Sequence, residues 1–347
     1  MARVLMLGWE FPPLISGGLA VATYGLVKEL SKQHTIILFI PKAAQSDLEA
    51  VQIIGLNKIT SQRLEAERIR KSLSFPNTEL QEIPIAISPY HEVNRTLADQ
   101  DVWSRLRQGG QFLETILEIF DNTTAYGWDI IHKVNLYATL VTELAADKTF
   151  DLIHAHDWVT YPAGVMLKQR FKVPLILHVH SLETDRAGQD CRNEIYYLEK
   201  SGLQQADRII AVSAYTRQQI IQHYGIQPSR IAVIHNGVEP IPTMRVPKSI
   251  NEKLVLFLGR ITQQKGPYAL IETAAKVVKK NPRVKFVVAG TGDQFAYALE
   301  SAAYRQLGKH FIFTGFQPRD RVEQLLGMAD VYFMPSVSEP FGLTALE

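Results

Sequence analysis

Short apolar runs recur along the first part of the chain, and a stretch long enough for a helix separates each run from the next. Between the first two runs, Val21, Tyr24 and Val27 have the three- to four-residue spacing of a helix face. The runs are apolar throughout rather than alternating, which is typical of strands buried on both faces of a parallel sheet. The pattern predicts a parallel α/β domain over residues 1–240. Its predicted strands are Arg3 to Gly8, Thr35 to Ile40, Leu152 to His156, Leu175 to His180, Arg208 to Ser213 and Ile231 to Asn236.

A proline-containing stretch interrupts this alternation. "GVEPIPTMRVPKSINEK" has three prolines, one glycine and no apolar period, so we interpret residues 241–252 as a linker. A second array of runs then predicts another parallel α/β domain over residues 253–347. Doubly wound sheets bind ligands beyond the carboxyl ends of their strands, so we expect the site in a cleft between the domains. The predicted strands of the second domain are Leu254 to Gly259, Lys285 to Gly290, Phe311 to Gly315 and Val331 to Ser336.

Residues 43–148 fit this alternation least well. Two groups of apolar side chains in this segment have helical spacing and predict two helices, whereas residues 60–100 are mixed. We interpret the segment as a helical elaboration of the first domain that faces an acceptor. The two groups are Phe112, Ile116, Leu117 and Phe120, and Leu136, Leu140, Val141 and Leu144.

Composition is consistent with two cores and excludes several classes of partner. The 347 residues are 46% hydrophobic, which suffices for two globular domains. The formal net charge is +2, with 37 basic and 35 acidic side chains, so nothing predicts a nucleic-acid partner or stable membrane insertion. The single cysteine, Cys191, cannot form an internal disulfide and has no recognisable base partner for a nucleophilic role. The N-terminal residues have no long apolar segment, so we expect a cytoplasmic protein; oligomeric state has no signal.

Two glycine-containing turns follow predicted strands. After the first strand, Gly17 and Gly18 allow a close backbone turn whose amides open a helix, a natural seat for phosphate; the alternative is a plain turn. No Gly-Lys-Ser/Thr follows, so this is not a P-loop. In the second domain, "AGTGD" places Gly290 in a similar turn that could approach a nucleotide base.

Histidines end two predicted strands of the first domain. His154 and His156 share one strand face and, with Asp157, could hold a metal ion, but no third ligand cluster is obvious. The alternative is structural, with Asp157 as the N-cap of the following helix, where it could also accept a bond from a sugar hydroxyl. His178 and His180 repeat the arrangement on the next strand.

Charged side chains end strands of the second domain. Arg260 follows a strand directly, and Lys265 lies beside Gly266 where a helix opens, a combination that suits a diphosphate leaving group without a metal. The alternative is two solvated loop cations. Glu339 precedes a glycine turn and Glu347 lies on the helix beyond it, so the two carboxylates could bind hydroxyls of both sugars of a nucleotide-sugar. A hydrolase acid/base pair is the competing idea and needs both acids to flank one bond.

Eight motifs in chain order resemble one enzyme family. They are "SGGLA", "HAHDW", "HVHS", "HNGVE", "GRITQQKG", "GTGD", "TGF" and "SEPFGLTALE". As a set they resemble the retaining nucleotide-sugar glycosyltransferases of family 4, and the start "WEFPPLISGGLA" with "HAHDW" is most similar to glycogen and starch synthases. The resemblance implies the GT-B fold, with two Rossmann-like domains, and a hexosyltransferase that moves glucose or a related hexose from an ADP- or UDP-sugar to a glycan. It implies no cofactor and no metal.

The resemblance also implies residue roles. Catalytic roles fall on Glu339, Arg260, Lys265 and His180. Donor binding falls on Gly17, Gly18, Arg260, Lys265, Gly290, Glu339, Gly342, Leu343 and Glu347, with Glu347 on the ribose. The acceptor side falls on Asp157, His156 and Asn236. The sugar would leave through an oxocarbenium-like state while the diphosphate helps to deprotonate the incoming hydroxyl on the same face.

Two departures from the family pattern limit the assignment. Bacterial glycogen synthases carry a lysine at the position of Ile15, and the family continues past the position of Glu347 with further helices, so we expect an incomplete second domain. Other family 4 transferases, of the mannosyl or sucrose/trehalose type, stay open as alternatives. So do a nucleotide-sugar epimerase or phosphorylase of the same architecture and a sugar-nucleotide binder without catalysis.

Overall fold

The chain forms two compact units, each built on a parallel sheet. The computed structural model describes residues 1–12, 18–41, 52–55, 78–82, 130–238, 246–248 and 250–347. Unit 1 contains Met1–Glu183 and Cys191–His235, and unit 2 contains Thr184–Asp190 and Asn236–Glu347. The grouping of Thr184–Asp190 with the second unit has no counterpart in the apolar pattern. In the described residues, no helix combines the length and the apolar character needed to cross a membrane.

The sheet of unit 1 has the strand order β3-β4-β2-β1-β5-β6-β7-β8, and every pairing is parallel. The six strands predicted from apolar runs are confirmed. The sequence missed β3 and β4, because "QIIG" and "TELQE" are too short or too polar to make an apolar run. The bounds are β1 Arg3–Leu7, β2 Thr35–Ile40, β3 Gln52–Gly55, β4 Thr78–Glu82, β5 Leu152–His156, β6 Leu175–Val179, β7 Arg208–Ala211 and β8 Ile231–Val233.

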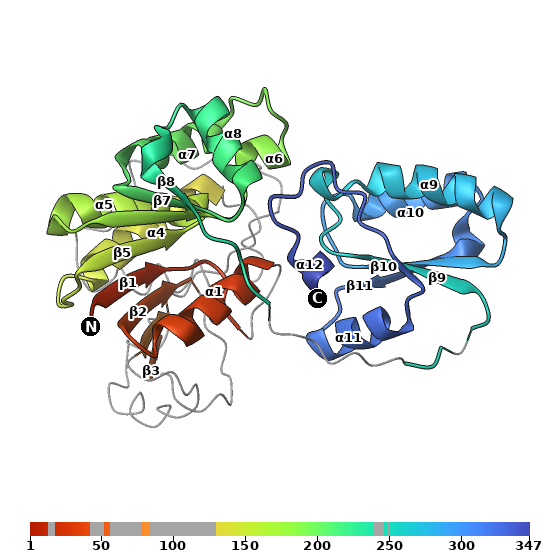
Figure 1. Ribbon diagram of the computed structural model, residues 1–347, viewed down its shortest axis with the longest axis horizontal. Coiled ribbons are helices and arrows are strands. Elements are labelled where there is room, and N and C mark those ends of the chain that lie inside the picture. The colour runs from red at the N-terminus through yellow and green to blue at the C-terminus, as the bar shows by residue number, and fades with distance from the viewer. Residues whose placement is uncertain (13–17, 42–51, 56–77, 83–129, 239–245, 249) are drawn as a thin grey trace. The chain divides into compact units, whose positions relative to one another are not determined.

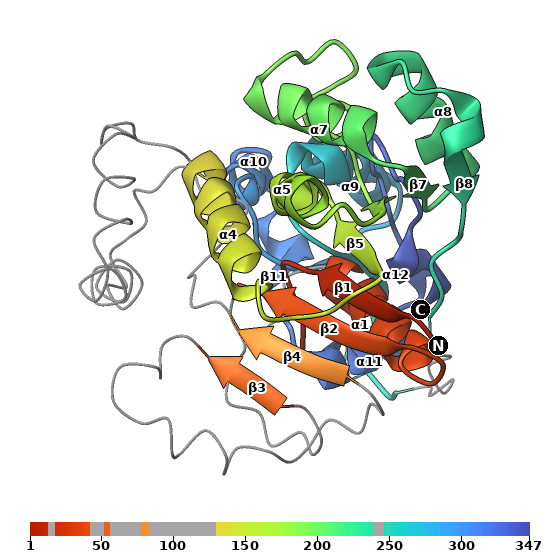
Figure 2. The same ribbon diagram turned by 90° about the vertical axis from the view of Figure 1, so that its left-hand side faces the viewer.

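Helices cover both faces of this sheet. Alternate residues of β1 enter different cores: Leu5 packs with α4 and α5, whereas Met6 packs with α1. Figure 2 shows α4 and α5 over one side of the strands. The helices predicted around Val21 and Leu136 are confirmed as α1 and α4; the one predicted around Phe112 lies outside the described residues. The bounds are α1 Gly18–Leu30, α4 Ile130–Leu144, α5 Tyr161–Phe171, α7 Glu194–Gln205 and α8 Ala214–Tyr224. The short helix α6, Glu183–Arg186, begins at the last residue of the first segment of unit 1, and its other residues belong to the segment grouped with unit 2.

The sheet of unit 2 has the strand order β11-β10-β9-β12, again all parallel. Helices α9 and α10 cover one face and α11 covers the other (Figure 1). All four predicted strands are present, but β12 has only two residues. Pro335 follows three residues after its end and has no N–H with which to extend the hydrogen-bond ladder. The bounds are β9 Lys253–Leu258, β10 Val284–Ala289, β11 Phe311–Gly315, β12 Val331–Tyr332, α9 Pro267–Lys280, α10 Phe295–Tyr304, α11 Arg319–Met328 and α12 Leu343–Leu346.

Candidate functional site

In unit 2, the loops after β9, β10 and β12 meet at one edge of the sheet. β9 pairs with β10 on one side and β12 on the other, so the carboxyl ends of these three strands are neighbours. Arg260 is half-buried and follows the end of β9 by two residues. A 3₁₀ turn, Gln263–Lys265, then leads into α9. The predicted sequence of strand, basic residue and helix start is therefore present.

The structure brings Lys265 and Glu339 into contact across this edge. Lys265 Nζ lies 2.7 Å from Glu339 Oε2, although 74 positions separate the two residues. Ser336 Oγ donates to the same carboxylate oxygen at 2.9 Å. Both charged side chains are 22% exposed, so Lys265 is held in a partly buried ion pair rather than solvated as a loop cation.

One backbone bond and one side-chain bond hold the Glu339 loop against the 3₁₀ turn. Val337 N donates to Gln264 O at 2.8 Å, and Gln264 Nε2 donates to Ser338 O at 3.3 Å. Gln264 is buried, which suits a side chain that ties two loops together. Sequence reasoning missed both Gln264 and Ser336: Gln264 lies in "GRITQQKG", where only the charged residues and glycine were assigned roles, and Ser336 lies outside the eight motifs.

Two glycines make these loop contacts possible. Gly266 has φ +72°, and a Cβ there would lie 2.1 Å from Pro335 O. Gly290 has φ +142°, and a Cβ there would lie 1.9 Å from Gly259 O. No side chain fits at either distance, so only glycine lets the loops approach. The predicted approach of Gly290 to a base stays a prediction; its observed neighbour is the turn after β9.

Glu347 is the C-cap residue of the short helix α12, one position past its last helical residue rather than on the helix as predicted. Gly342 has φ +84° and precedes α12, which starts at Leu343. Tyr332 Oη and Thr344 Oγ1 are 2.8 Å apart, which links α12 to β12. Burial raises the pKa of Glu347, Arg319 opposes that shift, and Glu323 adds to it.

In unit 1, four histidines gather at the ends of β5 and β6. The strands pair in register, with His156 opposite His178. Neighbouring imidazole rings lie 4.4 to 5.5 Å apart between centroids. His156 Nδ1 and His180 Nε2 are 3.0 Å apart. The predicted shared face of His154 and His156 is confirmed, and parallel pairing adds the second strand to it.

Burial makes these imidazoles neutral at physiological pH. It lowers the pKa of His154 to about 4 and that of His180 to about 3, and it lowers the pKa of His156 and His178 well below the usual value. Neighbouring histidines lower the pKa of His156, His178 and His180 further, because two positively charged rings would repel each other.

Asp157 stands at the N-cap position of a 3₁₀ turn, but its side chain does not cap that turn, so the capping part of the prediction is wrong. It precedes the 3₁₀ turn Trp158–Thr160 and makes no side-chain capping bond there, while Thr160 is the N-cap residue of α5. Asp157 has φ +58°, and its Oδ1 instead accepts from His180 N at 2.7 Å and Ser181 N at 3.3 Å. The carboxylate satisfies amides just past β6 and so positions His180.

The remaining predicted residues lie as follows. Gly18 is the first residue of α1, as expected for a glycine turn that opens a helix, whereas Gly17 and Ile15 lie outside the described residues. Asn236 is half-buried and follows β8 by three residues. Within unit 1 the structure thus brings His156, His180 and Asp157 together.

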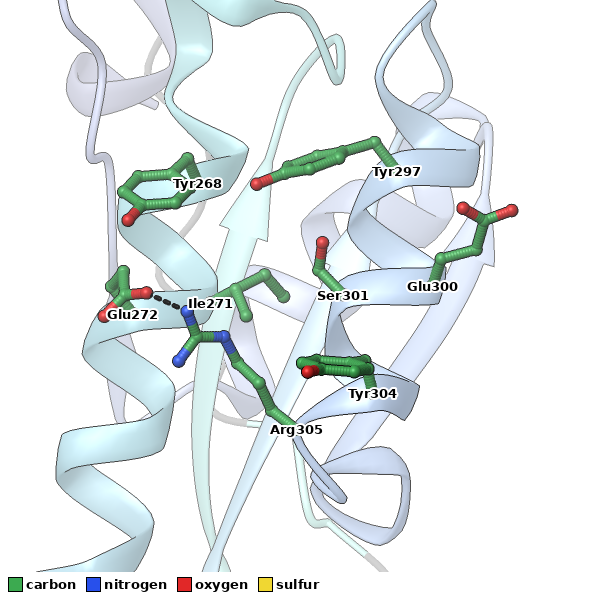
Figure 3. A pocket seen from close by; sticks show the side chains of 8 residues that line it. All are labelled: Tyr268, Ile271, Glu272, Tyr297, Glu300, Ser301, Tyr304 and Arg305. Carbon is green, nitrogen blue, oxygen red and sulfur yellow. Dashed lines mark hydrogen bonds and ion pairs between the residues drawn. The ribbon is translucent and has the colours of Figure 1, made fainter.

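A separate pocket lies between α9 and α10 of unit 2 (Figure 3). Tyrosine side chains from both helices surround it, and Arg305 pairs with Glu272 at its side. It shares no lining residue with the strand-end loops, and no sequence motif singled it out. Its lining residues are Tyr268, Ile271, Glu272, Tyr297, Glu300, Ser301, Tyr304 and Arg305.

Two family models match this chain, one in each unit. Residues 104–240 match Glycosyltransferase Family 4, and residues 242–347 match Glycosyl transferases group 1. The uncharacterized glycosyltransferase MJ1607 of Methanocaldococcus jannaschii is 34% identical over 59% of this chain and 56% of its own length. This chain therefore spans little more than half of that relative. The glycogen synthase of Mycobacterium tuberculosis is 24% identical over 99% of this chain and 75% of its own.

A solved structure extends the comparison to the fold. Anabaena Alr3699/HepE, crystallised with UDP and glucose, superposes with a TM-score of 0.61 at 16% identity. The superposition covers 99% of this chain and 77% of that one. At this identity the likeness concerns the arrangement of the elements.

Proposed function

Since the chain belongs to the glycosyltransferases and has the GT-B fold, we propose that it moves a hexose, glucose in the first instance, from a nucleotide-diphosphate sugar to a glycan. The donor is an ADP- or UDP-sugar, and the anomeric configuration is retained. The observation that carries the proposal is the contact of Lys265 with Glu339 at the carboxyl edge of the unit 2 sheet. A cation and an acid placed together there suit a ligand that carries both phosphate and sugar hydroxyls.

On the donor side, Arg260 and Lys265 would neutralise the diphosphate. Before the donor binds, Glu339 holds the ammonium of Lys265 in position at 2.7 Å. Diphosphate oxygens would compete for that ammonium and release the carboxylate of Glu339 toward the sugar. The Ser336 hydroxyl, bonded to Glu339 at 2.9 Å, would limit how far the carboxylate moves.

On the acceptor side, His156, His180 and Asp157 would orient a sugar hydroxyl. Asp157 fixes the backbone of His180 through the 2.7 Å bond to its amide. Because the imidazoles are neutral near pH 7, they can donate or accept a hydrogen bond without adding positive charge.

In the reaction, the bond between the anomeric carbon and the diphosphate oxygen breaks, and the acceptor oxygen forms the new bond on the same face. The acceptor proton passes to the departing diphosphate. Positive charge from Arg260 and Lys265 would stabilise the negative charge that develops there, and such preorganised groups commonly account for much of the rate. We assign this role to the two side chains and to no metal ion.

A donor screen tests the proposal directly. The purified chain is mixed with ADP-glucose, UDP-glucose and other nucleotide-sugars in the presence of maltooligosaccharide, and released nucleotide and product configuration are followed. We expect nucleotide release that depends on the acceptor, with an α-linked product from an α-linked donor. A β-linked product would contradict retention, and conversion of the donor sugar without acceptor would point to an epimerase.

The variant Arg260→Ala sharpens the test. Removing one charge-stabilising group should lower kcat by about 10²- to 10³-fold. Lys280→Ala is the matched control, since Lys280 is an exposed cation at the end of α9, and it should keep wild-type turnover. Near-normal turnover of a folded Arg260→Ala protein would refute the donor assignment.

A further inference from the structure

We propose that His154, His156 and His178 form a binding site for a zinc ion in unit 1. One ring nitrogen from each of the three residues lies within 4.8 Å of those of the other two. The side chains come from two neighbouring strands, since His154 and His156 lie on β5 and His178 lies on β6. Two of the ligands, His154 and His156, lie on one strand and could be identified from the sequence. The third, His178, is brought to them by the parallel pairing of β5 with β6.

Their burial and missing hydrogen bonds point to a ligand. His154 and His178 are 5% exposed and His156 is fully buried. Among the described residues, no group bonds to His154 Nε2, His156 Nε2 or either ring nitrogen of His178. Buried polar atoms nearly always have a partner, so several such nitrogens in one place need an explanation. A metal ion would use their lone pairs.

The neighbouring histidine orients one ligand. His156 Nδ1 lies 3.0 Å from His180 Nε2. When Nδ1 donates its proton to His180, the lone pair of His156 is on Nε2, the nitrogen that has no other partner. Metal-binding histidines usually make such a bond through the second nitrogen.

Imidazole nitrogens favour zinc over magnesium or calcium, which prefer oxygen ligands. Zinc binds histidine nitrogen at about 2.0–2.1 Å, so the three nitrogens would move closer together than the 4.8 Å limit. Rotation of the three side chains would bring them to that distance. Three protein ligands leave a fourth position for water. This site differs from the sequence-based expectation of no metal. It shares His156 with the proposed acceptor side, so with zinc bound His180 and Asp157 would orient the sugar hydroxyl, and the zinc-binding measurements are separate from the transfer assay.

The test uses the full chain, purified without a polyhistidine tag and freed of metal with a chelator. Zinc binding is measured by competition with an indicator dye, and cobalt(II) is added separately for its visible absorption. We expect one ion per chain, a tetrahedral cobalt spectrum and a higher melting temperature with zinc. Absence of binding by the folded wild-type chain would overturn the proposal.

Variants locate the ion. His154→Gln and His178→Gln should each weaken zinc binding by at least about 100-fold, since each removes a ligand. His310→Gln is the matched control, because His310 is also 5% exposed but lies in unit 2, where its Nδ1 contacts Val284 O. Equal binding by the wild type and a folded His178→Gln protein would contradict the site.

If a variant fails to fold, X-ray absorption at the zinc edge of the zinc-loaded wild-type chain gives the number of imidazole ligands directly. Three imidazole ligands support the proposal, and fewer than three overturn it.

Discussion

The ion pair of Lys265 and Glu339 should couple the loops after β9 and β12 energetically. At 2.7 Å, two unit charges attract by about 6 kcal/mol at an effective dielectric constant of 20. Most of this is cancelled by the loss of hydration, and the 22% exposure of each side chain adds solvent screening. We therefore expect a coupling free energy of about 1–2 kcal/mol, above that of an exposed pair and below that of a fully buried one.

A double-mutant cycle measures this coupling. The four proteins are the wild type, Lys265→Met, Glu339→Gln and the double variant, and the free energy of local opening comes from hydrogen exchange. The Val337 amide is the reporter, because it bonds to Gln264 O within the tied loops. Tryptophan fluorescence would follow unit 1 instead, since all four tryptophans precede residue 160.

Both single variants should increase hydrogen exchange at the Val337 amide. The double variant should lower the free energy of local opening by less than the sum of the two single effects. The coupling should shrink with added salt, because the pair is partly exposed. A coupling below about 0.3 kcal/mol, which is within the usual additivity error, would refute the idea that this pair joins the two loops.

Three further substitutions test which contacts stabilise each unit. Gly290→Ala should destabilise unit 2 by about 2–4 kcal/mol in calorimetry, since a Cβ would lie 1.9 Å from Gly259 O at φ +142°, whereas Gly308→Ala, with no atom within 4 Å, should be nearly neutral. Tyr137→Phe should lower the stability of unit 1 by about 1–2 kcal/mol, followed by tryptophan fluorescence, because the buried hydroxyl lies 3.0 Å from Phe39 O and 3.2 Å from Gly8 O; an unchanged denaturation midpoint would count against that role. A side-chain bond from Lys248, the Leu254 amide and a bond from Lys253 hold the pKa of Asp330 well below its usual range. That lowered pKa contributes stability at pH values above the ordinary carboxyl pKa of about 4, and the contribution is lost as the pH falls toward the folded value. Asp330→Asn should therefore flatten the fall of melting temperature with acid, and an unchanged slope would contradict this.

The sequence by itself determined six of the eight strands in the sheet of unit 1, the four strands of unit 2, and which charged and glycine residues follow their ends. A run such as "TIILFI" is buried on both faces in a parallel sheet, so its apolar pattern predicts a strand without knowledge of its neighbours. The strands β3 and β4 were not predicted, because backbone pairing toward the edge of a sheet does not require an apolar run. Charged and glycine residues at strand ends, such as Arg260 and Gly266, were also readable, since parallel strands present their ligand-binding loops there.

Only the tertiary structure decided which strand ends meet. β12 lies beside β9 although two strands come between them in the chain, and that order brings Glu339 to Lys265. The same holds in unit 1, where the register of β5 with β6 adds His178 to the pair on one strand. Buried strands look alike in sequence, because their apolar runs encode burial but not the identity of the neighbouring strand. Contacts between their loops therefore depend on packing of the whole sheet.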